Sequence, residues 1–167
     1  MDNFETIYID TPQDRQLILQ NVHQVRALVR SVTHSVPQQA YYTPRYHGWS
    51  LAVILAHLNW IDTLALVSLK AALLNIRPRF SMASIDRMNN FTARMFAQRT
   101  IENSWRATDK NIKRISDFVL YLPMDKFSKA IFYPPHNDYL TVEKALQHYF
   151  IGHWTYHLHE ILAVDSI

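Results

Sequence analysis

Glycine and cysteine are the residues that this sequence has least of: its 167 residues include two glycines and no cysteine. Sheet-rich proteins use glycine in hairpins and bulges, so this scarcity favours helices joined by short loops. It also excludes the glycine-rich phosphate loops of nucleotide-binding enzymes. Because cysteine is absent, the chain contains no disulfide, no cysteine-ligated metal and no thiol nucleophile of its own.

Charge and hydrophobicity predict a folded protein without a nucleic-acid or membrane partner. The chain is 49% hydrophobic and 19% charged, and its net charge is +3. Its lysines and arginines are spread along the sequence beside acidic residues, which is typical of a solvated surface. Residues 51–74 are strongly apolar, but residues such as His57 and Asp62 interrupt them, so we expect a buried bundle helix. The first residues lack the pattern of a signal peptide, and we expect a cytoplasmic protein.

Apolar residues recur at steps of three and four in several long stretches, which predicts helices. The long stretches are residues 12–36, 51–75, 100–122 and 141–167, and a shorter one spans residues 84–99. The connection between the second long helix and the one that contains Trp105 is not short. We therefore predict one domain, residues 1–167, folded as an all-α four-helix bundle with a short extra helix and one long crossover. Residues 124–140 form a long aromatic loop of the kind that often shapes a site.

The last predicted helix contains two histidines at the spacing of metal ligands. His153 and His157 are four residues apart, so they lie about 6 Å apart along the helix axis and about 40° apart around it. Two imidazoles in this arrangement can converge on one divalent ion, although two structural imidazoles would show the same pattern. Glu160 lies on the same face. His148 and His159 point elsewhere by the same geometry, and we expect both on the surface.

A third histidine lies in the second helix, among apolar neighbours. An imidazole buried at His57 needs a partner, because an unsatisfied buried polar group costs about 1–3 kcal/mol. A carbonyl group or a metal ion could fill that role.

Two motifs resemble those of a known family. Residues 48–58, Gly-Trp-Ser-Leu-Ala-Val-Ile-Leu-Ala-His-Leu, look like the WSxxxxxxHL signature of DinB/YfiT-like proteins. Residues 153–161, His-Trp-Thr-Tyr-His-Leu-His-Glu-Ile, look like their terminal HxxxHxxQI. The resemblance implies a four-helix bundle in which His57, His153 and His157 bind one divalent metal ion. Neutral imidazole suits both zinc and nickel, so the ion could be either.

Glu160 departs from that motif, which usually has glutamine at this position. A carboxylate near a dication could stabilise the metal, orient a histidine or act as a base, and we treat Glu160 as the candidate catalytic residue. The alternative is a glutamate at the edge of the solvent that pairs with a basic residue.

The family includes enzymes that activate a low-molecular-weight thiol, so the resemblance implies a metal-dependent thiol transferase. Without cysteine in the chain, the thiol would be a cosubstrate, and Tyr156 or residues 124–140 would shape the pocket for a small-molecule substrate. Two alternatives stay open: a metal-dependent hydrolase with Glu160 as the base, and a non-enzymatic stress-related or partner-binding bundle. Apolar helix faces would also suit a homodimer.

Overall fold

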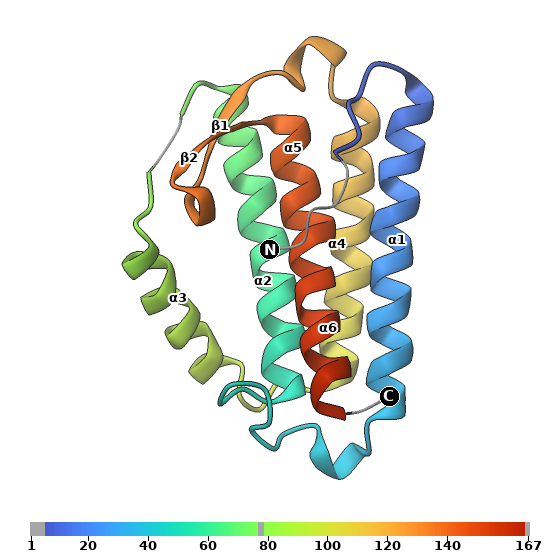
Figure 1. The fold of residues 1–167 in the computed structure, drawn as a ribbon, viewed down its shortest axis with the longest axis vertical. Helices are drawn as coiled ribbons and strands as arrows, with labels where there is room; N and C mark the ends of the chain where they lie inside the picture. Colours follow the sequence, from blue (N-terminus) through green and yellow to red (C-terminus); the bar gives the residue numbers. More distant parts are fainter. Residues whose placement is uncertain (1–5, 77–78, 166–167) are drawn as a thin grey trace.

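Four helical rods form a bundle in the computed structural model, which describes residues 6–76 and 79–165 (Figure 1). Three rods are single helices: α1 (Pro12–Ser35), α2 (Leu51–Leu73) and α4 (Ile101–Tyr121). The fourth rod consists of α5 (Val142–Gln147), a π-helical segment (His148–Gly152) and α6 (His153–Asp165). Helix α3 (Met82–Met95) and a hairpin of β1 (Ala130–Tyr133) and β2 (Asp138–Thr141) lie beside the bundle. The predicted all-α four-helix bundle with a short extra helix is confirmed.

The rods do not simply alternate in direction. In the view of Figure 1, α1 and the C-terminal rod run downwards, whereas α2 and α4 both run upwards. Two hydrogen bonds agree with this: Asn59, near the start of α2, donates to the carbonyl of Ser104 near the start of α4 at 3.0 Å. Arg15, near the start of α1, donates to the carbonyl of Val119 near the end of α4 at 2.8 Å. Since α2 and α4 are parallel neighbours, the chain must return between them, and α3 lies on this predicted crossover.

Side-chain caps fix where the long helices begin. Thr11 accepts a hydrogen bond from the backbone of Asp14, whose carboxylate accepts one from the backbone of Thr11, and Pro12 follows at the first helical position. This reciprocal cap satisfies donors that the first turn leaves free. The hydroxyls of Ser50, Thr100 and Thr141 likewise accept hydrogen bonds at the starts of α2, α4 and α5.

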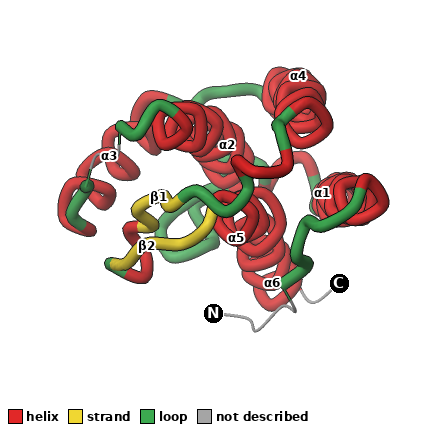
Figure 2. The backbone as a smooth tube through the Cα atoms, turned by 90° about the horizontal axis from the view of Figure 1, so that it is seen from above, coloured by secondary structure: helices red, strands yellow, loops and turns green. Residues whose placement is uncertain are grey.

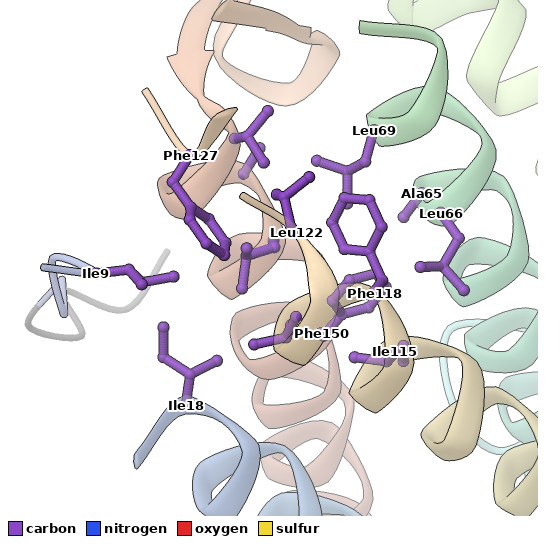
Figure 3. Close-up of a cluster of buried hydrophobic side chains, with 14 of the residues drawn as sticks. Ile9, Ile18, Ala65, Leu66, Leu69, Ile115, Phe118, Leu122, Phe127 and Phe150 are labelled. Atoms are coloured by element: carbon purple, nitrogen blue, oxygen red, sulfur yellow. The ribbon is translucent and has the colours of Figure 1, made fainter. Parts of the chain in front are cut away.

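Helix α2 is the most apolar element, and it packs against α4, α3 and the C-terminal rod. It is long and apolar enough to cross a membrane, yet 67% of its most apolar window is buried within the bundle. Near its end, Leu66 and Leu69 pack with Phe118 and Phe150 (Figure 3). Its burial therefore agrees with the predicted bundle helix.

The segment between α4 and α5 contains a β-hairpin, although the sequence predicted a loop there. Strands β1 and β2 pair antiparallel, with Ile131 opposite Leu140. The turn uses Asn137, which adopts a φ of +51°. Asparagine tolerates this left-handed conformation, so the hairpin needs no glycine, and the scarcity of glycine did not exclude it.

The C-terminal helix is interrupted, although the sequence predicted one regular helix. A π turn contains an extra residue, so a constant 100° step no longer relates the positions before and after it. His148, predicted on the surface, is half-buried, and its ring centroid lies 5.2 Å from that of Tyr133 and 5.1 Å from that of His136. His159 lies after the π segment and is exposed, as predicted.

Candidate metal centre

The structure brings the three predicted histidines together. His57 lies in the second turn of α2, and His153 and His157 lie in the first turns of α6. One ring nitrogen of each lies within 4.8 Å of those of the other two. The Nε2 atoms of His57 and His153 are 3.1 Å apart. All three pairs of rings meet edge to face, with centroids 4.9 to 5.4 Å apart.

The donor set and its spacing fit a divalent ion. Bonds of about 2.0–2.1 Å to zinc place two tetrahedral nitrogen ligands about 3.3 Å apart, close to the separation of His57 and His153. Burial, with a contribution from His157, lowers the pKa of His57 to about 3. Burial also holds the pKa of His153 well below its ordinary value. Both rings are therefore neutral near pH 7, which is the form that binds metal.

The hydrogen bonding of these rings does not match that of structural core histidines. The Nδ1 atoms of His57 and His153 are buried, and neither has a hydrogen-bond partner among the described residues. A core imidazole is normally satisfied by a carbonyl or a carboxylate, because an unmade hydrogen bond is costly. The close Nε2 pair instead presents two ring nitrogens to one point.

Glu160 contacts His157 directly. Its Oε2 accepts a hydrogen bond from Nδ1 of His157 at 2.7 Å, and its side chain is 12% exposed. Its other oxygen lies 3.9 Å from Nε2 of His47. With the proton held on Nδ1, Nε2 of His157 keeps its lone pair, as in the carboxylate–histidine pairs around many metal sites. Among the roles considered for Glu160, this contact supports orientation of a histidine.

Trp49 is a site residue that was not predicted from the sequence. Its ring lies edge to face with that of His57, with the ring centroids 4.9 Å apart. It is nearly parallel to the ring of His157, with the centroids 6.5 Å apart. A tight turn places it there, with His47 at a φ of +49° and Gly48 at +89°, a value that suits glycine. Its position in the sequence could have pointed to the site, because this tryptophan is the first residue of the WSxxxxxxHL motif that contains His57.

A large cavity adjoins the histidines. It has a volume of 410 Å³ and lies between α2, α3 and the hairpin, and His57 and His153 form part of its wall. Tyr133, Pro134 and Pro135 also line it, so the predicted site-shaping segment 124–140 does contribute. Tyr156, the other candidate, is 54% exposed and is not among the lining residues. Helix α3 forms one wall, which the sequence analysis did not predict.

A buried ionic network lies next to His153. Arg26 donates to Oδ2 of Asp62 at 2.9 Å and to the carbonyl of Phe150, in the π segment, at 2.8 Å. The indole of Trp154 donates to Oδ1 of Asp62 at 3.1 Å, and the guanidinium of Arg26 lies 4.4 Å from the centroid of that indole. The network thus ties α1 and α2 to the π turn that immediately precedes His153.

Comparison with known proteins identifies the architecture. No family model and no curated protein matches the chain. A solved structure does: YfiT from Bacillus subtilis, described as a probable metal-dependent hydrolase with an unusual four-helix bundle topology. The match has a TM-score of 0.71 and 16% sequence identity, and it covers 99% of this chain and 92% of YfiT. The chain has the YfiT fold.

The YfiT fold agrees with the resemblance seen in the two sequence motifs. Viewed from above, α2 and the C-terminal rod are neighbours in the bundle, which allows residues 96 positions apart in the chain to meet (Figure 2). The fold therefore explains how His57 reaches His153.

Proposed function

We propose that this protein is a metal-dependent enzyme of the DinB/YfiT-like family, in which His57, His153 and His157 hold one zinc or nickel ion. The convergence of three imidazoles beside a cavity, two of them held neutral by burial, is the observation that carries the proposal. A set of three histidines leaves a coordination position for water or substrate, which is typical of catalytic rather than structural sites.

The reaction we favour is transfer of a low-molecular-weight thiol that enters as a cosubstrate. A divalent ion held by the histidines would lower the pKa of a coordinated thiol or water and so supply a nucleophile at neutral pH. No carboxylate lines the cavity among the described residues, and Glu160 is engaged by Nδ1 of His157. A thiol held by the ion would be deprotonated outright and would need no base from the protein, whereas a bound water would be only partly ionised near neutral pH. The arrangement of the residues therefore supports thiol transfer.

Hydrolysis is the second candidate, and the description of YfiT as a probable metal-dependent hydrolase favours it. As the base, Glu160 would act through Oε1 or leave His157, because Oε2 is bonded to Nδ1 of that ring. Turnover that is independent of thiol and is abolished by Glu160→Gln would establish this alternative. Conjugation that requires an added thiol and persists in Glu160→Gln would exclude it.

The residues around the ion would have separate tasks. Glu160 holds the tautomer and orientation of His157, and Trp49 packs against His57 and His157. The cavity walls hold the substrate and keep water away from the reacting groups. The cytoplasmic location, the single domain, the homodimer and the lack of a nucleic-acid or membrane partner stay predictions.

Elemental analysis of untagged protein tests the site. We expect about one equivalent of zinc or nickel in the wild type and a loss of it in His57→Ala, His153→Ala and His157→Ala. His159→Ala is the matched control, because His159 lies on the same helix and is exposed. No metal in the wild type, even after reconstitution, would favour the non-enzymatic bundle.

A further inference from the structure

The cavity beside the histidines is apolar along most of its length. Among the described residues, none of those that line it is an aspartate, glutamate, lysine or arginine. Its walls include Ile61 and Leu64 from α2, Ile85 and Met88 from α3, and Pro134 from the hairpin. The volume of 410 Å³ is within the range of sites that bind whole small molecules.

Helix α3 makes one wall adaptable. Among its described residues, Thr92 alone is buried, so the helix packs lightly against the bundle. It contributes two methionines to the lining, Met82 and Met88. Unbranched thioether side chains adjust to apolar surfaces of different shape. This wall suits alkyl or aryl groups rather than one fixed polar ligand.

The polar groups of the cavity are few. Hydroxyl-bearing residues in its lining are Ser68, Ser84, Tyr133 and Tyr149. His57 and His153 belong to its wall, and Oδ1 of Asn89 is buried without a hydrogen-bond partner among the described residues. An N–H or O–H of a ligand would satisfy this oxygen. An ionised group inside the cavity would instead lose its water without gaining a charged partner, which is costly.

We infer that the substrate is a neutral molecule with a mainly alkyl or aryl body, which lies between α2 and α3 and directs its reacting polar group toward His57 and His153. The inference rests on the proposed metal function, because it assigns a substrate class to that site. The apolar molecule is the acceptor in thiol transfer or the molecule cleaved in hydrolysis.

A homologous series of neutral ligands tests this. Straight-chain hydroxamic acids bind zinc through the same head group, and their chains can be lengthened from acetyl to decanoyl. Titration of the zinc-loaded protein by calorimetry should show an affinity gain of about fourfold for each added methylene until the cavity is filled. Suberic acid monohydroxamate has a carboxylate at the chain end, and it should bind about tenfold or more weakly than octanohydroxamic acid.

Two variants locate the effect in the cavity. Ser68 lines it about 16 Å along α2 from His57, and helical side chains lean toward the N-terminus of their helix. Ser68→Trp should therefore remove the gain in affinity for the longest chains and leave the affinity for acetohydroxamic acid unchanged. Lys70 is exposed on the same helix, so Lys70→Trp should change neither affinity. If Ser68→Trp does not fold, Ile85→Ser serves the same purpose by removing apolar wall, with the exposed Phe91→Ser as its control.

The outcomes separate the two proposals. The apolar substrate is supported if affinity rises with chain length in the wild type and in Lys70→Trp, but not in Ser68→Trp. If acetohydroxamic acid binds but longer chains bind no more tightly, the proposed substrate class is overturned and the metal site stands. Failure of zinc to bind at all overturns the proposed function, and the inference falls with it.

Discussion

Glu160 is the residue at which this chain departs from the motif that it resembles. Its Oε2 accepts a hydrogen bond from Nδ1 of His157 at 2.7 Å, so its first task is to hold a ring rather than to take part in bond cleavage. A glutamine at this position can accept the same hydrogen bond through its amide oxygen, but it adds no negative charge. The orientation of the ring and the charge can therefore be tested separately.

We expect Glu160→Ala to weaken zinc binding about 10–100-fold, the usual effect of losing a partner that orients a metal ligand. Glu160→Gln should stay close to the wild type, because it keeps the hydrogen bond. Competition with a chromophoric chelator measures both affinities, and Glu102→Ala, an exposed glutamate, is the control. Wild-type affinity in Glu160→Ala would exclude the orienting role, and an equal loss in both variants would assign the effect to charge.

Single residues also show what the sequence could predict about the site. His57, His153 and His157 were found because helical spacing and two motifs point to them. Trp49 was missed because a motif does not state what its tryptophan touches. Asn89 gave no signal, since its role depends on where α3 lies relative to α2, which no local pattern encodes.

Among the elements, the π segment most directly determines the position of His153. The carbonyl of Phe150 in this segment accepts a hydrogen bond from Arg26, whose charge is balanced by the buried Asp62. Burial raises the pKa of Asp62, and the ion pair with Arg26 opposes this rise. Removal of the guanidinium would take this donor from the carbonyl of Phe150 and leave the buried carboxylate of Asp62 with the indole of Trp154 but no balancing charge.

We expect Arg26→Ala to lower the free energy of unfolding by about 3–5 kcal/mol, because a buried ion pair that loses one member leaves an uncompensated group. The exposed pair of Arg30 and Asp109, one turn along α1, is the matched control. Asp109→Ala should cost less than about 1 kcal/mol. Urea denaturation measures both. If both variants lose a similar, small amount of unfolding free energy, the network does not stabilise the π segment.

The π segment and the hairpin were not predicted from the sequence, and each has a physical reason for this. The boundaries of α1, α2 and α4 were close to correct because proline, serine and threonine caps act locally. The π turn could not be found with a constant helical period, since one extra residue is stabilised by Arg26 from another helix. The hairpin was missed because the scarcity of glycine argued against turns of this kind, whereas Asn137 adopts the left-handed conformation here.

At the scale of the whole molecule, the proposed ion would join two rods of the bundle. His57 belongs to α2 and His153 to α6, and their Nε2 atoms meet at 3.1 Å although 96 positions separate them in the chain. Unfolding would separate these ligands. An ion bound to the folded state alone must therefore stabilise the bundle as a whole.

We expect zinc at 100 times its dissociation constant to add about 2.7 kcal/mol to the free energy of unfolding. For a chain of this length, that corresponds to a rise in Tm of roughly 5–11 °C, measured by calorimetry with and without a chelator. The rise should be absent in His57→Ala and complete in His159→Ala, each compared with its own metal-free form. An equal rise in His57→Ala would mean that zinc binds elsewhere, because a site that has lost the ligand from α2 no longer joins the two rods.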